Sequence, residues 1–486
     1  MSDVLELTVA QAIERISAGE LGSDEYFDAY AEAAAGDDLG AYLWKAEPGS
    51  SDGSSGELNG APIAIKDIFC TSGIETTAGS RILEGYRPPY SATAVRRLAE
   101  AGAQLLGKTN MDEFAMGSSN ENSGYGPVRN PWDTGRVPGG SSGGSAAVVA
   151  ARLAPWAIGT DTGGSIRQPA SLCGVVGMKP TYGAISRYGM VAFASSLDQC
   201  GPLTRDVTDA AILLRTMEGR DPCDSTSVGI EGGVELPSRI DLKGLRFGVP
   251  RELSSEAEGI EGGVREVFER MVGLIRDLGA EVDECELPHS AHGISAYYVL
   301  APAEASANLA RYDGVRYGLR AGASPDTERE LVSMYERTRA AGFGPEVRRR
   351  IMLGTYALSS GYYDAYYARA QRVRTKIAED FATAFERFDY LVTPTSPTVA
   401  FELGARSENP LAMYMADYCT VPMPLAGLPA ISIPAGLAQP DEGGPELPVG
   451  LQLVSPAFGE SGLLDAAHAI EGAIGFDARP PTGASG

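Results

Sequence analysis

PGGSSGGS occupies residues 138–145 and GTDTGGSIRQP occupies residues 159–169 of this 486-residue chain, and these two stretches are the most informative part of its sequence. Glycines flank serines in both, which lets backbone N–H groups approach a ligand closely. The second stretch follows an apolar strand and precedes a possible helix start, the usual setting of an oxyanion pocket or a nucleophile. These features favour a functional site over two flexible glycine turns.

A serine nucleophile needs a base, and the chain has only three histidines: His289, His292 and His468. None stands in a context typical of a catalytic triad or a metal site, so lysine is the next candidate. Lys66 ends an apolar strand predicted at 61–67. To act as a base its pKa must fall about 3 units, which costs about 4 kcal/mol. The alternative is a strand-end lysine that faces solvent.

Strand and helix patterns alternate along the chain, which favours an α/β sheet with helices on both faces. Helices are expected at 8–19, where Thr8 would cap, at 93–102, from 111 in MDEFAM, at 145–153, and between about 298 and 388. Strands are expected at 104–110, 245–250, 280–287, 389–395, 430–434 and 449–454, and residues 156–165 are expected to form a strand that runs into a glycine turn. Residues 47–60 are rich in Gly and Ser and predict a surface link.

Composition narrows the functional classes. The formal net charge is −24, and six of the 40 basic residues are lysine. This balance argues against a nucleic-acid-binding surface. It is typical of proteins adapted to molar salt, although a GC-rich genome is the alternative origin. The six cysteines form no C-x-x-C pair, which predicts reduced thiols in a cytosolic protein and no zinc site.

Two further segments invite wrong interpretations. The uncharged stretch 418–440 contains five prolines that would break a membrane helix, so we expect loops and short strands there. The acidic start MSDVLELT is unlike a signal peptide. Residues 102–109 match the phosphate-loop pattern G-x-x-x-x-G-K-[ST]. A helix precedes that pattern and a strand fills it, which is the wrong order of elements for a nucleotide site.

The double motif resembles the amidase signature family, with Lys66 lying 99 positions and Ser141 lying 24 positions before Ser165. The resemblance implies a mixed central β-sheet flanked by α-helices on both faces, in one domain over 1–486. The catalytic core would span about 61–205, and a helical substrate-side region about 290–388. Outside the core, stretches such as EASANLARYDGVRYG, RRRIMLGTYALSSGYYDAYY and LAGLPAISIP are similar to the family branch that serves tRNA-dependent amidotransferases.

The resemblance also implies a Ser–Ser–Lys catalytic unit. Ser165 would be the nucleophile, Ser141 the bridging serine held by a cis peptide to Ser142, and Lys66 the base. A non-proline cis bond is rare and persists only where the surrounding structure enforces it. The oxyanion hole would consist of backbone N–H groups of Thr162, Gly163, Gly164 and Ser165.

The same family branch implies L-glutamine as the substrate. Arg350 would bind the α-carboxylate, because a guanidinium fork suits a carboxylate. Without the resemblance, Arg350 would be taken as an exposed member of an arginine run. Asp417 would pair with the α-ammonium group, and Thr162 would contact the substrate. Tyr298 is the preferred additional pocket residue, with Tyr297 as the alternative.

Partners follow from the resemblance as well. Ammonia would pass to a tRNA-binding partner, the B subunit, which uses ATP and magnesium to amidate misacylated tRNA. A small third component, the C subunit, would brace the heterotrimer. No cofactor, metal or membrane is expected on this chain. Two other hypotheses are a stand-alone amidase acting on small-molecule amides and a non-catalytic interaction protein. A non-catalytic interaction protein would be expected to lack a catalytic residue, whereas Lys66, Ser141 and Ser165 are all present in this chain.

Overall fold

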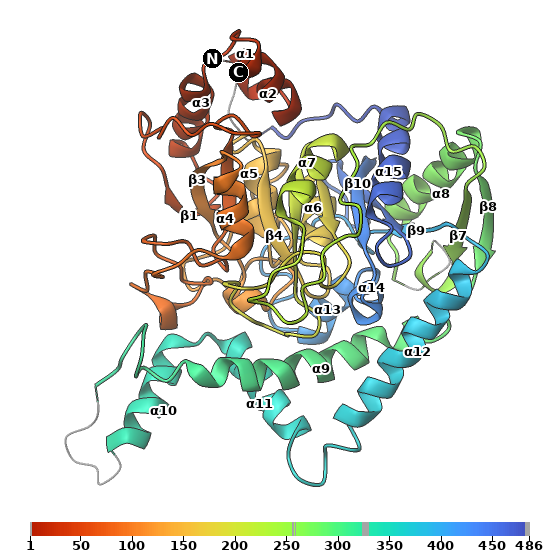
Figure 1. Cartoon of the computed structure of the whole chain (residues 1–486). Helices are drawn as coiled ribbons and strands as arrows, with labels where there is room; N and C mark the ends of the chain where they lie inside the picture. Colours follow the sequence, from red (N-terminus) through yellow and green to blue (C-terminus); the bar gives the residue numbers. More distant parts are fainter. Residues whose placement is uncertain (1, 255–256, 258, 323–329, 482–486) are drawn as a thin grey trace.

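A mixed eleven-stranded sheet forms the centre of the molecule in the computed structural model, which describes residues 2–254, 257, 259–322 and 330–481 (Figure 1). The strand order is β1-β3-β2-β4-β6-β5-β10-β11-β9-β7-β8. The strands are β1 (Tyr42–Lys45), β2 (Pro62–Lys66), β3 (Gln104–Thr109), β4 (Ala157–Asp161), β5 (Val176–Lys179), β6 (Gln199–Thr204), β7 (Arg246–Pro250), β8 (Glu281–Cys285), β9 (Tyr390–Pro394), β10 (Ala430–Ala438) and β11 (Leu447–Val454).

Strand β2 carries the candidate base at its carboxyl end. It pairs in parallel with both β3 and β4, and all five of its residues are buried. Such an unbroken apolar run is typical of a parallel strand covered on both faces. The neighbouring pairs β4–β6, β6–β5 and β5–β10 are antiparallel. The sheet is therefore mixed, as predicted.

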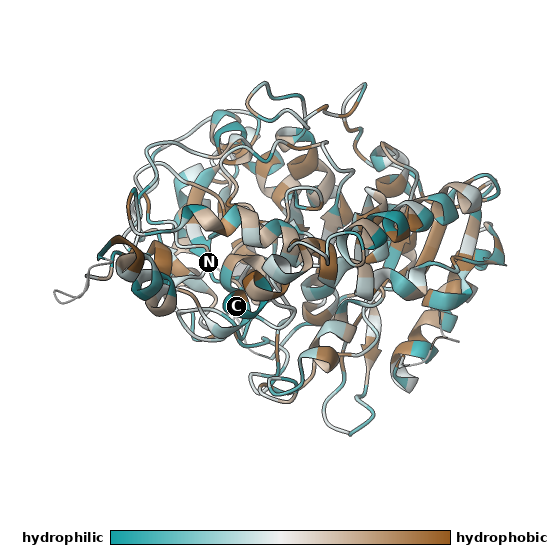
Figure 2. Cartoon of the chain, turned by 90° about the horizontal axis from the view of Figure 1, so that it is seen from below, coloured by the Kyte–Doolittle hydropathy of each residue, from teal (hydrophilic) through white to brown (hydrophobic). Residues whose placement is uncertain are grey.

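Helices flank this sheet in two groups. Helices α4, α7, α15 and α8 pack in series, whereas α5 and α6 form a separate pair against the strands. Figure 2 shows brown and teal residues mixed along the helices. This is the pattern expected where one side of a helix packs on a core. The helices up to the middle of the chain are α1 (Ser2–Glu6), α2 (Val9–Ser17), α3 (Ser23–Ala35), α4 (Thr93–Glu100), α5 (Gly143–Ala150), α6 (Arg167–Cys173), α7 (Val207–Met217) and α8 (Gly262–Asp277).

Four helices of the second half lie along one edge of the molecule (Figure 1). We call α9 to α12 the helical arm; α9 packs against both α11 and α12. They are α9 (Gly293–Asn308), α10 (Glu330–Gly342), α11 (Pro345–Ala357) and α12 (Tyr367–Phe385). The remaining helices are α13 (Pro410–Tyr414), α14 (Pro422–Ala426) and α15 (Glu460–Ile474).

Several local predictions are confirmed. Thr8 caps α2 in a capping box with Gln11. Residues 47–60 contain no helix or strand. In the stretch 102–109, helix α4 precedes the first glycine and β3 fills the interval, so the order of elements is not that of a phosphate loop. Five of the six cysteines are buried, and all six are free. No helix in the described ranges is long and apolar enough to cross a membrane.

The helix predicted from 111 in MDEFAM is wrong. Only the short 3-10 turn Glu113–Ala115 forms there, and Phe114 and Ala115 have φ values of 50° and 61°. Residues in this left-handed region cannot continue a right-handed helix. The Asp112 carboxylate accepts hydrogen bonds from the N–H groups of Asn120 and Asn122, so the chain folds back on itself.

The prediction of loops and short strands at 418–440 is partly wrong. The five-residue helix α14 begins at Pro422, where the missing N–H of proline leaves no hydrogen bond unmade. Strand β10 runs to Ala438 rather than ending near 434. A register shift between Pro434 and Gly436 lets the strand pass its proline.

Candidate active site

Lys66 lies at the carboxyl end of β2 and is wholly buried. Its Nζ is 2.7 Å from Ser141 Oγ, 2.8 Å from Ser142 Oγ and 2.8 Å from Thr160 Oγ1. All three closest partners are hydroxyl groups, and none is a carboxylate. The structure therefore brings Lys66 and Ser141 together, and the lysine does not face solvent.

Burial lowers the pKa of Lys66 from its ordinary value to about 7. The cause is desolvation, which disfavours the charged ammonium. The carboxylates of Asp112, Asp161 and Asp198 act in the opposite direction. Since a substantial fraction of Lys66 is neutral near pH 7, this amine can accept a proton from Ser141.

The cis peptide bond precedes Ser141 rather than following it: it joins Gly140 to Ser141. The prediction of a cis bond between Ser141 and Ser142 is therefore wrong by one position, and nothing in a run of glycines and serines distinguishes these two bonds. Gly140 itself is required by space. A Cβ there would lie 2.1 Å from Asp112 Oδ2.

Asp112 is a residue of this site that the sequence reasoning missed. It is buried, and desolvation raises its pKa to about 6, although the N–H groups of Asn122 and Asn120 and nearby Lys66 lower it. Its backbone N–H donates to the carbonyl oxygen of Ser141 at 3.3 Å. No motif spacing identifies it, because it lies in the stretch that was predicted to be helical.

Ser165 lies in the turn between β4 and α6. It is 7 % exposed, and its carbonyl oxygen accepts a 3.1 Å hydrogen bond from the N–H of Ser142, which joins the two glycine-rich stretches. Asp161 and Arg167 hold the turn with a buried two-point ion pair, Nε–Oδ2 and Nη2–Oδ1, each 2.9 Å. Such bidentate pairs fix geometry as well as charge.

The predicted oxyanion residues occupy this same turn. Gly164 has φ +142°, and a Cβ there would lie 2.2 Å from Thr420 Oγ1. A Cβ at Gly163 would lie 2.8 Å from the Cζ atom of Tyr297. Both positions therefore require glycine. The side chain of Thr162 points to a carboxylate, because its Oγ1 donates to Asp198 Oδ1 at 2.7 Å.

Arg350 on α11 is buried, contrary to the interpretation of an exposed arginine run. Its Nε donates to Glu346 Oε1 at 2.8 Å, and no hydrogen bond engages its terminal nitrogens Nη1 and Nη2 among the described residues. Although desolvation lowers the pKa of Arg350, the net effect of Tyr298, Glu346 and other neighbours is to raise it. The guanidinium is thus charged and held from one side.

Asp417 is buried and lies near Arg350, since both contact Tyr298. Ser118 Oγ donates to its Oδ2 at 2.7 Å, and Tyr298 OH lies 3.4 Å from that oxygen. Desolvation raises the pKa of Asp417 to about 7, although Ser118 and Arg350 lower it. An acid and an arginine with free donors therefore share one buried region.

Tyr298 connects these two charges. Its ring centroid is 5.1 Å from the Arg350 guanidinium carbon and stacks on Tyr414 at 3.7 Å. Tyr297 lies at the glycine turn instead, with its ring against Gly163. Both tyrosines border the site: Tyr298 at the charged end and Tyr297 beside the serine turn. The sequence reasoning missed Ser118, Glu346 and Tyr414. Ser118 donates to Asp417 from far away in the sequence, Glu346 accepts from Arg350 four residues later, and Tyr414 OH donates to Glu346.

The histidines take no part in this site. His289 Nδ1 lies 2.8 Å from Asp380 Oδ1 between β8 and α9, and His468 lies on α15. Among the described residues, no cluster of three or more His, Cys, Asp or Glu side chains is arranged to hold a metal ion.

Comparison with known proteins defines the class. The model of the Amidase family matches residues 31–464, so the chain belongs to the amidase family. It is similar to the A subunit of glutamyl-tRNA(Gln) amidotransferase from Moorella thermoacetica, with 58 % identity over 88 % of this chain and 85 % of that protein. The A subunit of the same enzyme from Acidothermus cellulolyticus is 52 % identical over 97 % of this chain and 95 % of its own length.

Solved structures agree. The crystal structure of the A subunit of glutamyl-tRNA(Gln) amidotransferase from Thermotoga maritima matches with a TM-score of 0.82 and 41 % identity, over 99 % of both chains. A peptide amidase from Stenotrophomonas maltophilia matches with a TM-score of 0.78 and 31 % identity, over 98 % of this chain and 99 % of the other. The same fold thus serves one component of a complex and an enzyme named for peptide amides.

Proposed function

We propose that this chain is the glutamine-hydrolysing subunit of a tRNA-dependent amidotransferase, an enzyme that forms a carbon–nitrogen bond with glutamine as amide donor. The observation that carries the proposal is that Lys66 contacts Ser141, while the buried side chains of Arg350 and Asp417 both contact Tyr298. A basic and an acidic side chain near one another suit the head group of a free amino acid. The names of the relatives support the same assignment.

In the proposed mechanism Ser165 Oγ attacks the side-chain amide carbon of glutamine. Its proton passes to Ser141, and the Ser141 proton passes to neutral Lys66. The N–H groups of the turn at 162–165 stabilise the developing oxyanion, an effect worth about 10²–10³ in rate per donor. The C–N bond then breaks, and the proton returns from Lys66 through Ser141 to the leaving ammonia. Water hydrolyses the acyl ester and releases glutamate.

Substrate selection comes from the charged end of the pocket. Nη1 and Nη2 of Arg350 would bind the α-carboxylate, because Glu346 engages only Nε. Asp417 would accept from the α-ammonium, with Tyr298 and Thr162 lining the pocket. Leaving Arg350 or Asp417 without a partner costs binding energy, which disfavours amides that lack these charges.

We further propose that the ammonia passes to the tRNA-binding B subunit of a cytoplasmic heterotrimer, which a small C subunit completes. The B subunit would use ATP and magnesium to amidate Glu-tRNA(Gln) or Asp-tRNA(Asn), and this chain would hold no cofactor. Exposed apolar side chains on the helical arm and α13 support a protein contact there. They include Leu331, Met352, Leu353, Tyr356, Tyr362, Tyr363, Tyr366 and Leu411.

The composition supports a salt-rich setting. A net charge of −24 destabilises the folded chain by self-repulsion, and molar salt screens this repulsion. We therefore propose that the host is a halophile. The thermal unfolding midpoint should rise between roughly 0.2 and 2 M KCl. A midpoint that does not rise would contradict this assignment.

The test of the function uses the complex. The tagged chain is purified from its own cells in high-potassium buffer, and co-eluting proteins are identified by mass spectrometry. Stoichiometric recovery of two further subunits is expected. In that complex Ser165→Ala abolishes glutamine-dependent amidation of tRNA and leaves ammonia-dependent amidation intact. Loss of both reactions would remove Ser165 from its role, and recovery of the chain alone would favour a stand-alone amidase acting on small-molecule amides.

A further inference from the structure

The segment from Phe193 to Asp198 folds around one buried carboxylate. Asp198 Oδ2 accepts from the N–H of Phe193 at 2.9 Å and from the N–H of Ala194 at 3.0 Å, and Oδ1 lies 3.1 Å from the same Ala194 nitrogen. Oδ1 also accepts from Thr162 Oγ1 at 2.7 Å. Because Asp198 is buried, these donors are its main source of stabilisation. One carboxylate thus links this segment to the serine turn.

The two ends of this link reach the two ends of the pocket. Thr162 opens the turn that carries Ser165 and the proposed oxyanion donors. Phe193 is wholly buried, and its ring centroid lies 5.6 Å from the guanidinium carbon of Arg350. A shift of Asp198 would therefore move both the turn that reacts and the platform under the arginine.

The segment is also anchored from outside. Glu304 on α9 accepts from the N–H of Ser196 at 2.8 Å, and Arg374 on α12 donates to the carbonyl oxygen of Ser196 at 3.0 Å. The helical arm is thereby tied to the same short segment. These bonds hold the segment against the arm.

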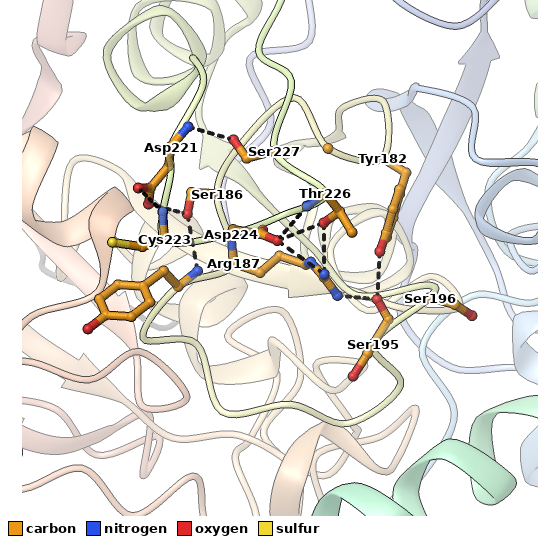
Figure 3. A network of polar contacts seen from close by, with 12 residues as sticks. Tyr182, Ser186, Arg187, Ser195, Ser196, Asp221, Cys223, Asp224, Thr226 and Ser227 are labelled. Carbon is orange, nitrogen blue, oxygen red and sulfur yellow. Dashed lines mark hydrogen bonds and ion pairs between the residues drawn. The ribbon is translucent and has the colours of Figure 1, made fainter.

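A second set of contacts belongs to the polar network in Figure 3. Tyr182 OH donates to the carbonyl oxygen of Ser195 at 2.7 Å, and Arg187 also donates to that oxygen. Arg187 in turn donates to Thr226 Oγ1 at 2.8 Å and pairs with Asp224. This network lies outside the catalytic groups and braces Ser195 within the segment.

We propose that Asp198 is a positioning residue that sets the serine turn through Thr162 and the arginine platform through Phe193, and so couples nucleophile geometry to recognition of the amino-acid head group. Asp198 touches neither the substrate nor the reacting atoms in this assignment. It acts by fixing two pocket walls at once, which is how a buried second layer keeps reacting groups within a fraction of an ångström. The inference rests on the proposed function only for the identity of the substrate.

Two measurements distinguish an effect on the serine turn from an effect on the arginine platform. A fluorophosphonate reagent reports the reactivity of Ser165 without needing Arg350, and the KM for glutamine divided by the KM for a simple uncharged amide reports head-group recognition. Asp198→Asn replaces one accepting oxygen by an N–H₂ donor, which cannot accept from Thr162 and the segment N–H groups together. We expect about 10–100-fold slower labelling and a rise in the KM ratio of about tenfold.

Two single-wall variants sharpen the assignment. Thr162→Val removes the hydroxyl donor but keeps the backbone N–H, and it is expected to slow labelling without changing the KM ratio. Phe193→Leu is expected to raise the KM ratio without changing labelling. The combined variant Thr162→Val with Asp198→Asn should slow labelling by less than the product of the two single effects, because both changes break the Thr162–Asp198 hydrogen bond.

Asp221→Asn is the matched control, since Asp221 is a buried acid of the Figure 3 network that accepts from Ser186 and Thr93 rather than from Thr162. Wild-type labelling and KM ratio in a folded Asp198→Asn variant, or equal losses in Asp221→Asn, would overturn the inference. Thr162→Val and Phe193→Leu keep it testable if Asp198→Asn does not fold. Undiminished labelling of Ser165→Ala would instead overturn the proposed function.

Discussion

Lys66 and Lys108 lie on the neighbouring parallel strands β2 and β3, and both side chains are wholly buried. Their surroundings differ. Lys108 Nζ forms an ion pair with Asp67 Oδ1 at 2.9 Å and also donates to the carbonyl oxygen of Phe69 and to Thr76 Oγ1. Lys66 contacts hydroxyl groups. Asp67 is the next residue after Lys66, yet its carboxylate pairs with the lysine of the other strand.

The difference shows how the partner of a buried lysine decides its role. Lys108 pairs with a carboxylate and has two further acceptors, an arrangement that holds structure. Lys66 lies among hydroxyl groups, and desolvation by burial lowers its pKa to about 7. Both lysines are wholly buried near the end of a strand, although Lys108 is in register with Ile65 rather than with Lys66, so burial does not identify the proposed base.

A third lysine shows that the pKa does not identify the base either. Lys179 at the end of β5 is also buried, and desolvation lowers its pKa to about 7, as does the charge of Arg167. Its Nζ donates to the carbonyl oxygen of Pro180 at 2.8 Å, and no serine hydroxyl in the described part of the chain bonds to it. What distinguishes Lys66 is the combination of a lowered pKa with the 2.7 Å contact to Ser141.

The largest expected effect comes from Lys66→Met. Removing the proposed base should lower kcat/KM for glutamine by about 10⁴-fold, as for loss of a member of other catalytic triads. The fold should survive, because the hydroxyls that remain are neutral, and the free energy of unfolding should change by less than about 2 kcal/mol. Glutaminase assays and urea unfolding check both. Residual activity within tenfold of wild type would mean that Lys66 is not the base.

Lys108→Met should give the opposite result. It leaves the Asp67 carboxylate buried and unpaired, which should lower the free energy of unfolding by about 3–5 kcal/mol. Activity per folded molecule should stay within about fivefold of wild type, because Lys108 contacts none of the serines. Urea unfolding at fixed KCl measures the loss, and adding Asp67→Asn should recover part of it. Equal stability of wild type and Lys108→Met would contradict the structural role of the pair.

The sequence predicted the strands on which these lysines lie. The spacing of Lys66, Ser141 and Ser165 along the chain indicated that these three residues belong to one site. Patterns of this kind are local: an apolar run with a lysine at its end, or glycines around serines. The sequence could not predict which lysine pairs with Asp67, because adjacent strands bring that pair together only in the folded sheet. For the same reason the sequence alone did not show that Arg350 is buried. The aromatic rings near its guanidinium group, those of Phe193 and Tyr298, lie far away in sequence.

Other errors of the sequence-based predictions have causes in the backbone or in long-range hydrogen bonds. The stretch from 111 has a helical composition, but the Asp112 carboxylate binds N–H groups eight and ten residues later and turns the chain. The bond that is cis could not be chosen among glycine and serine neighbours. Asp198 carries no local signal either, because its role depends on Thr162, 36 positions before it. Side chains that act through long-range hydrogen bonds are thus the part of the site that sequence reasoning misses.

Arg350 tests whether the partner of a buried basic side chain also decides its role in the helical arm. Glu346 holds its Nε, so a lysine at this position could keep the charge but not the two free terminal nitrogens. Arg350→Lys should raise the KM for glutamine by about 10–100-fold, because a charged hydrogen bond is worth about 1.5–3 kcal/mol. Hydrolysis of an uncharged amide should hardly change. If both substrates suffer equally, Arg350 does not bind the carboxylate.

The smallest effect is the pH dependence, which sharpens the comparison most. The pKa of Lys66 is lowered to about 7, so its neutral, accepting form increases as pH rises through 7. The pKa of Asp417 is raised to about 7, so its charged form increases over the same range. Below pH 7, kcat/KM for an uncharged amide should therefore rise about tenfold per pH unit, and more steeply for glutamine, which needs both groups. Lys179→Met should keep both profiles, since Lys179 also titrates near 7 but has no contact with Ser141. A profile that shifts with Lys179→Met, or the same slope for both substrates, would show that these groups do not govern the rise.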